Sequence, residues 1–199
     1  MQQHPELYSA LVGIGQMVSQ RQTDVMFYED TLAWAERSSD TELAQALVAL
    51  GPPPYADIRG YEQVIGHEHD WNAYPELNLD NEMPAILFVP EYTFMDRLNA
   101  FRGFLDTFAV LYPQLQGIDF RQTATSLSVP VYMVLGEHEA RGRAVPADEW
   151  FAMLNAPSTE RIVFDGAGHR AQFDRPADFA ALMSRVLHEA SGAGTASAE

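Results

Sequence analysis

The 199-residue chain contains no cysteine, few basic residues and no long apolar run. The absence of cysteine excludes disulfides, thiolate nucleophiles and zinc sites built on Cys, and it suits a reducing cytoplasm. Only 12 Lys and Arg stand against 28 Asp and Glu, which gives a formal charge of -16. A protein of this charge repels a phosphate backbone and anionic lipid. We therefore expect a cytoplasmic protein with no nucleic-acid partner and no membrane partner.

The longest apolar stretches lie near Leu11–Ile14 and Ile86–Val89. Both fall far below the ~20 residues that a membrane-spanning helix requires. The N-terminus has no basic segment before an apolar core, so it does not resemble a secretory signal peptide. A chain of this length can still bury one hydrophobic core without metal or disulfide support.

The apolar pattern changes twice along the chain. Residues 7–14 form a short apolar segment that predicts a buried strand. Residues 20–50, 57–74 and 94–111 repeat apolar side chains at helical spacing, whereas the proline-bounded apolar stretch at residues 83–92 has no assignable pattern. After Asp119, two strand-like runs at Val129–Leu135 and Arg161–Phe164 alternate with helical segments. This order implies parallel strands joined by right-handed crossovers, with functional loops at the carboxyl ends of the strands.

Polar residues follow both of these runs directly, in the segments Gly136–Glu139 and Asp165–His169. The pattern is a strand, a glycine, two residues and a carboxylate, then one helix, one strand and a small-residue loop that ends in histidine. In this it resembles the α/β-hydrolase family. The resemblance implies that Glu139 is the acid and His169 the general base of a catalytic triad. Glutamate replaces the commoner aspartate, but it can still accept the ring N–H of the histidine.

Each of these residues also has a purely structural interpretation. Glu139 can form a salt bridge with Arg141 or Arg143, and His169 can cap a loop. Their joint position after two adjacent strands favours the triad interpretation.

Three further histidines invite a functional interpretation. His138, like Glu137, is a rival for the acid or base role, although neither occupies the family's acid position. His67 and His69 flank Glu68 and suggest a metal site. On a helix, however, residues two apart point roughly 200° apart and do not share one ion. We therefore expect no metal and no cofactor.

Four short strings in the middle of the chain look like the helical cap of proline iminopeptidase-like hydrolases: Gly15–Val18, Tyr28–Asp30, Gly51–Tyr55 and Pro90–Thr93. The resemblance implies a cap over the catalytic site, where cap carboxylates can bind the free amine of a peptide substrate. Glu29, Asp30 and Glu91 are candidates for that role by residue type only. The alternative for each is a solvated helix charge.

The family places its nucleophile in a Gly-x-Ser-x-Gly elbow, and that motif does not occur in this sequence. The resemblance covers nearly the whole chain but only the C-terminal part of the family's domain. We expect the chain alone to be a very poor hydrolase, because triad members and oxyanion donors contribute most of such catalysis. A small peptide or ester would be the substrate if an N-terminal chain completed the site.

The predicted fold class is α/β: a partial α/β-hydrolase fold with about three parallel C-terminal strands, flanking helices and an all-helical cap. We expect the start of the core at residues 1–16, the cap at 17–125, the C-terminal core at 126–190 and a disordered tail at 191–199. An unpaired edge on the first strand predicts a homodimer, a complex with an N-terminal chain, or aggregation. The alternatives to a hydrolase are a catalytically inactive binding module and a cap-like interaction protein.

Overall fold

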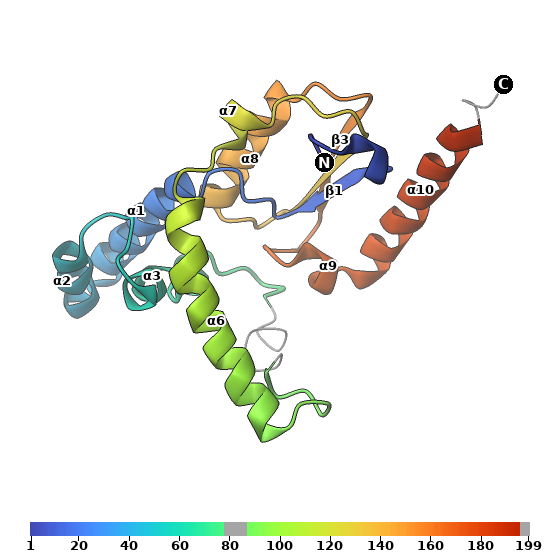
Figure 1. Ribbon diagram of the computed structural model, residues 1–199. Helices are drawn as coiled ribbons and strands as arrows, with labels where there is room; N and C mark the ends of the chain where they lie inside the picture. The colour runs from blue at the N-terminus through green and yellow to red at the C-terminus, as the bar shows by residue number, and fades with distance from the viewer. Residues whose placement is uncertain (78–86, 196–199) are drawn as a thin grey trace. The chain divides into compact units, whose positions relative to one another are not determined.

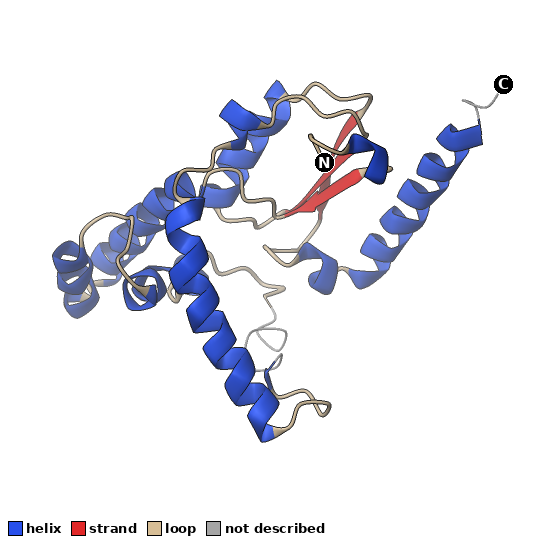
Figure 2. Cartoon of the chain, in the orientation of Figure 1, coloured by secondary structure: helices blue, strands red, loops and turns tan. Residues whose placement is uncertain are grey.

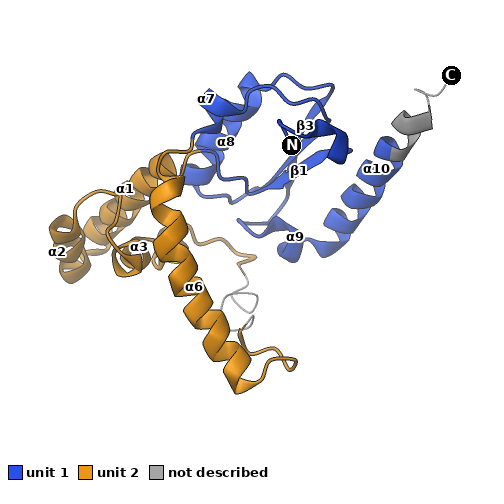
Figure 3. Ribbon diagram, viewed as in Figure 1, with its two compact units in different colours: residues 1–18, 119–199 blue, residues 19–118 orange. Residues whose placement is uncertain are grey.

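The computed structural model describes residues 1–77 and 87–195 and divides into two compact units (Figures 1 and 3). Unit 1 comprises residues 1–18 and 119–199 and contains a three-stranded sheet. Unit 2 comprises residues 19–118, and its described part contains helices and no strand (Figure 2). The protein is therefore of the mixed α/β class.

The sheet of unit 1 is entirely parallel and has the order β1-β2-β3. Its strands are β1 (Leu11–Ile14), β2 (Val131–Gly136) and β3 (Thr159–Phe164). The strand expected at residues 7–14 begins only at Leu11, because the preceding residues Pro5–Leu7 form the 3-10 turn η1. Since all three strands run in one direction, their carboxyl ends lie at one edge of the sheet.

Unit 1 also contains four helices in its described part: α7 (Phe120–Thr123), α8 (Arg141–Met153), α9 (Ala171–Asp174) and α10 (Pro176–Thr195). Helix α8 forms the crossover between β2 and β3. The disordered tail predicted from residue 191 does not begin there, because α10 continues to Thr195. Residues 196–199 lie outside the described residues.

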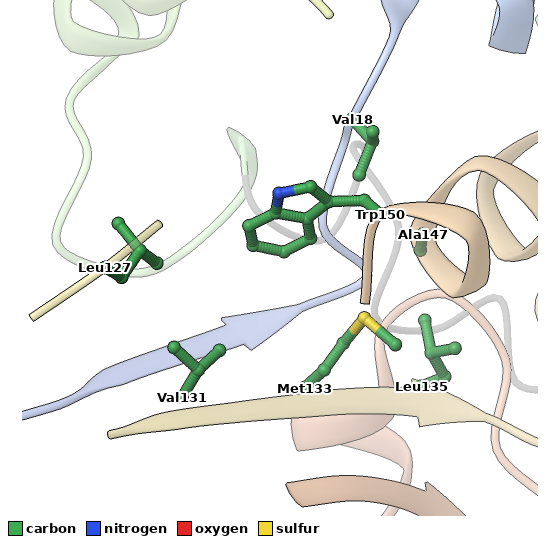
Figure 4. Packing of buried hydrophobic residues seen from close by; sticks show 7 residues of the cluster. All are labelled: Val18, Leu127, Val131, Met133, Leu135, Ala147 and Trp150. Atoms are coloured by element: carbon green, nitrogen blue, oxygen red, sulfur yellow. The ribbon is translucent and has the colours of Figure 1, made fainter. Parts of the chain in front are cut away.

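Strand β2 is the centre of the core of unit 1, and all six of its residues are buried. Val131, Met133 and Leu135 point toward Trp150 of α8 on one face of the sheet (Figure 4). On the other face, the alternate residues of β2 pack with buried side chains of α9 and α10. Burial on both faces explains why β2 is a continuous apolar run rather than an alternating one.

Unit 2 is built from five helices in its described part: α1 (Gln20–Ser38), α2 (Thr41–Leu50), α3 (Ile58–Ile65), α4 (Glu68–Trp71) and α6 (Phe94–Leu115). The helix starts follow local chemistry. Asp40 accepts a hydrogen bond from the Leu43 N–H at 3.0 Å, and Thr93 and Asp96 form a capping box before α6. Phe27 of α1 packs edge-on against Trp71 of α4, with ring centroids 5.3 Å apart.

The boundary between the units differs from the expected cap at residues 17–125. Phe120 packs on Trp150, with ring centroids 5.7 Å apart, and its N–H donates to the carbonyl of Val18 at 3.0 Å. Residues 119–125 therefore belong to the sheet unit, and unit 2 ends at Ile118.

Candidate acid–histidine site

The carboxyl ends of β2 and β3 hold the residues that the sequence singled out. Glu139 lies three residues after the end of β2, and His169 lies five residues after the end of β3. Because β2 and β3 are parallel neighbours, the two loops meet at the same edge of the sheet. The Nδ1 atom of His169 lies 3.1 Å from Oε2 of Glu139, so the expected contact is present.

The carboxylate of Glu139 is almost fully buried, with a side-chain exposure of 2%. Its second oxygen, Oε1, accepts a hydrogen bond from Nε of Arg143 at 2.6 Å and another from the backbone N–H of Ala140 at 3.2 Å. Burial alone would raise the pKa of Glu139. The hydrogen bond from His169 and the charge of Arg143 outweigh burial and hold the pKa below its ordinary value. Glu139 is therefore a carboxylate at neutral pH.

Two acidic side chains accept hydrogen bonds from the backbone of the loop that carries His169. Glu137 accepts a hydrogen bond from the N–H of Gly166 at 2.8 Å. Asp174, in α9, accepts one from the N–H of Gly168 at 2.9 Å. The backbone of the loop is thus held at Gly166 and at Gly168, directly before the histidine.

The two rivals for the acid and base roles have other contacts. Glu137 accepts its hydrogen bond from the backbone of the histidine loop. His138 donates its backbone N–H to the carbonyl of Ala167 at 2.9 Å, and its Nε2 lies 3.9 Å from Glu137. Among the described residues, the acid–histidine pair with a buried carboxylate at the ends of β2 and β3 is the one formed by Glu139 and His169.

Glycine at two strand ends permits this close packing. Gly15, directly after β1, has a φ of +51°, and a Cβ at this position would lie 2.6 Å from Nδ1 of His169. At Gly136, the last residue of β2, a Cβ would lie 2.2 Å from the carbonyl oxygen of Gly168. Sequence reasoning placed Gly15 in a cap-like string and missed its contact with the histidine. Its position directly after a predicted strand was the available signal.

The arrangement suits general acid–base chemistry. With Glu139 ionised, the proton of neutral His169 resides on Nδ1, and Nε2 carries the lone pair. The histidine side chain is 44% exposed, so the ring remains accessible while its acid partner is buried. In the described part of the chain, no hydroxyl group is hydrogen-bonded to His169.

The three carboxylates that the sequence offered for substrate binding belong to a different unit from the acid–histidine pair. Glu29 and Asp30 lie on α1, and Glu91 lies in the exposed turn before α6. All three belong to unit 2, whereas Glu139 and His169 belong to unit 1.

Among the described residues of unit 2, Asp24 is a buried acid that sequence reasoning missed. Its side chain accepts hydrogen bonds from Gln20 at 2.7 Å, Tyr112 at 2.8 Å and Gln116 at 3.0 Å. Burial raises the pKa of Asp24 above its ordinary value, although each of these three hydrogen bonds favours the carboxylate. The available signal was helical spacing, since Asp24 lies one turn before the buried Phe27.

Of the two histidines considered for a metal site, His67 makes local contacts. Nδ1 of His67 lies 2.8 Å from the carboxylate of Asp70, and its ring stacks on Trp34 with centroids 5.9 Å apart. Over residues 1–77 and 87–195, no group of three or more possible metal ligands comes together.

Comparisons of the chain with protein-family models, curated protein sequences and solved structures found no match. The resemblance to α/β-hydrolases therefore stays a prediction from the motif residues. Within the part of the chain that the structure describes, no helix combines the length and the apolar character needed to cross a membrane.

Proposed function

We propose that this chain supplies the acid and the general base of an α/β-hydrolase triad, Glu139 and His169, while the nucleophile lies outside these 199 residues. The observation that carries the proposal is the 3.1 Å contact between His169 Nδ1 and the buried carboxylate of Glu139. The two groups sit at the carboxyl ends of adjacent parallel strands. Functional groups gather at this edge in parallel α/β sheets.

Each residue has a defined task in this reaction. Nε2 of His169 accepts the proton of the attacking hydroxyl and later donates it to the leaving group. Glu139 keeps the ring in the Nδ1–H tautomer and stabilises the imidazolium that forms in between. The reaction is acyl transfer, and it uses no cofactor.

The substrate class follows from the resemblance to proline iminopeptidase-like hydrolases. It is a small peptide or ester, with unit 2 in the role of the cap. Ester, amide and N-terminal peptide hydrolysis share one triad and differ in pocket shape. The assay therefore includes both an activated ester and a prolyl arylamide.

An inactive binding module of the same fold is the competing function. The contact between Glu139 and His169 disfavours it, because an inactive binding module has no need to keep a histidine ring nitrogen within hydrogen-bond distance of a buried carboxylate.

Reconstitution with a nucleophile-bearing polypeptide tests the proposal. The purified chain is assayed with p-nitrophenyl acetate and a prolyl arylamide, alone and with the polypeptide encoded immediately upstream of it. We expect no hydrolysis by the chain alone above a His169→Gln control. The mixture should be active, and His169→Gln and Glu139→Gln should each reduce its rate about 100-fold or more. His138→Gln is the matched control and should retain the rate.

Three outcomes would contradict the proposal. Hydrolysis by the chain alone that disappears in His169→Gln would place the nucleophile within these 199 residues. A reconstituted activity that survives His169→Gln would remove the histidine from the mechanism. An inactive mixture, or an upstream polypeptide without Gly-x-Ser-x-Gly, would favour the binding module.

A further inference from the structure

Arg143 lies next to the acid–histidine pair. The sequence motif that predicted Glu139 and His169 includes no arginine. Arg143 is the third residue of α8, and its side chain is only 9% exposed. Its Nε donates to Oε1 of Glu139 at 2.6 Å. A guanidinium this deeply buried requires a partner that compensates its desolvation, and the carboxylate of Glu139 is that partner.

The position of Arg143 on its helix is unfavourable by itself. The first turn of a helix carries a partial positive charge and favours acidic side chains. The first turn of α8 contains no acidic residue, and it contains Arg141 and Arg143. Helix electrostatics therefore do not explain a buried arginine here, whereas the contact with Glu139 does.

The two oxygens of Glu139 have separate partners. Oε1 accepts from Arg143 and from the N–H of Ala140, and Oε2 faces Nδ1 of His169. A glutamate side chain has one more rotatable bond than aspartate, so its carboxylate needs a second anchor to present one oxygen steadily.

We propose that Arg143 is a positioning residue that anchors Oε1 of Glu139, keeps this carboxylate ionised and directs Oε2 to His169, and thereby fixes the tautomer of the histidine. This role rests on the proposed function of the pair, since it acts through Glu139 and Arg143 itself touches no reacting atom. Without the arginine, the buried carboxylate turns or takes up a proton, and the ring loses the acceptor that holds its Nδ1 proton.

Other charged groups lie close to the histidine loop, and a substitution at Arg143 leaves them unchanged. Glu137 and Asp174 bond its backbone through Gly166 and Gly168, and His138 lies beside Glu137. None of them contacts the Oε1 atom that Arg143 holds, so a change at Arg143 tests the anchor alone.

Long-range ¹H–¹⁵N correlation spectra of the ¹⁵N-histidine-labelled chain measure the tautomer directly. His169→Gln identifies the signal of His169 among the six histidines. In the wild-type chain, we expect neutral His169 to carry its proton mainly on Nδ1. In Arg143→Met, the Nδ1–H form should become the minority. Arg141→Met removes the same charge from an exposed position of the same helical turn and should leave the wild-type tautomer unchanged.

A double variant tests the same role if Arg143→Met alone does not fold. It also shows whether the effect of Arg143 passes through Glu139. Glu139→Gln/Arg143→Met removes both charges, so it leaves no uncompensated charge buried. If Arg143 acts through Glu139, this double variant should have the same tautomer ratio as Glu139→Gln alone. A further change in the double variant would overturn the proposal.

The wild-type tautomer ratio in a folded Arg143→Met chain would also overturn it, and would leave Arg143 a purely structural residue that affects stability alone. These spectra require no nucleophile and no turnover. Failure of the anchor is therefore distinguishable from failure of the proposed hydrolase, which the reconstitution assay measures.

Discussion

At the residue scale, Gly15 determines how closely the histidine ring approaches the end of β1. The residue combines a φ of +51° with a position where a Cβ would lie 2.6 Å from His169 Nδ1. Gly51 gives a comparison for strain without collision, because it also has a positive φ, with ψ at 175°, but has open space where a Cβ would be. Comparing the two glycine positions distinguishes backbone strain from collision with the histidine ring.

We predict that Gly15→Ala costs about 1–3 kcal/mol more than Gly51→Ala, because both introduce backbone strain but only the first displaces a packed ring. Native-state hydrogen exchange measures each loss in its own unit, with amides of β2 for Gly15→Ala and amides of α2 for Gly51→Ala. Gly15→Ala should also shift the NMR signals of His169. Equal losses and an unchanged histidine signal would show that the ring does not depend on this glycine.

The two buried carboxylates, Asp24 and Glu139, affect stability in opposite directions as pH changes. The folded-state pKa of Asp24 lies above its unfolded value of 3.8, so between the two values the folded state binds more protons and stability falls as pH rises. The folded-state pKa of Glu139 lies below its unfolded value of 4.5, so its contribution is present above pH 4.5 and is lost as pH falls.

Asp24→Asn should therefore be tolerated at neutral pH. An Asn side chain avoids burying a charge, and the Oε1 atom of Gln116, which is buried without a hydrogen-bond partner, can accept from its amide after rotation. We predict that the variant gains on the order of 1 kcal/mol relative to wild type between pH 4 and pH 7. Urea unfolding at both pH values, with the exposed Asp106→Asn as control, measures this change. A loss above about 2 kcal/mol with no pH trend would contradict it.

Glu139 also shows what the sequence could and could not predict at this scale. The strand–Gly–x–x–carboxylate spacing was sufficient to predict its contact with His169. The salt bridge to Arg143 had been considered as an alternative to that contact, but Glu139 makes both because its two oxygens have different partners. Asp24 and Tyr112 are separated by 88 positions, and no local pattern predicts a contact of that range.

At the scale of elements, β2 was predictable because an apolar run bounded by proline and glycine is typical of a strand buried on both faces. The start of β1 and the end of α10 were not, since short turns and helix ends depend on tertiary contacts more than on periodicity. The residues between 78 and 86 lie outside the described residues, so the unassigned stretch at 83–92 is described only from residue 87.

Strand β1 has only one neighbouring strand in the described part of the chain. The N–H groups of Leu11 and Gly15 donate to carbonyls of Pro130 and Val134, on the side of β2. Because the amides of a strand alternate, those of Val12 and Ile14 face the outer side. We predict that the amides of Val12 and Ile14 exchange faster than those of Leu11 and Gly15, by NMR-detected hydrogen exchange. Equal protection of all four would mean that the outer edge is covered.

At the scale of the whole molecule, exposed apolar side chains favour association. On α6, Phe94 is 77% exposed and Phe101 48%, and Leu98 lies between them at 41%. Clusters of this kind are rare on monomer surfaces. The charge of -16 opposes association, but salt screens it.

We therefore predict a mass that rises with concentration in static light scattering, and more steeply at 0.5 M than at 0.05 M salt. Leu98→Ser/Phe101→Ser should weaken the rise. Val48→Ser is the control, since Val48 is 67% exposed on the separate helix α2. A monomer mass at every concentration and salt level would contradict this prediction.

The central claim, that Glu139 prepares His169 to act as a base, is tested most directly by the position of the proton on the neutral ring. The ¹⁵N shifts of His169 report it in the isolated chain, in wild type and in Glu139→Gln. We expect Nδ1–H with an unprotonated Nε2 in wild type, and a change toward Nε2–H in the variant. A wild-type ring protonated on Nε2, or a tautomer ratio that Glu139→Gln leaves unchanged, would contradict it.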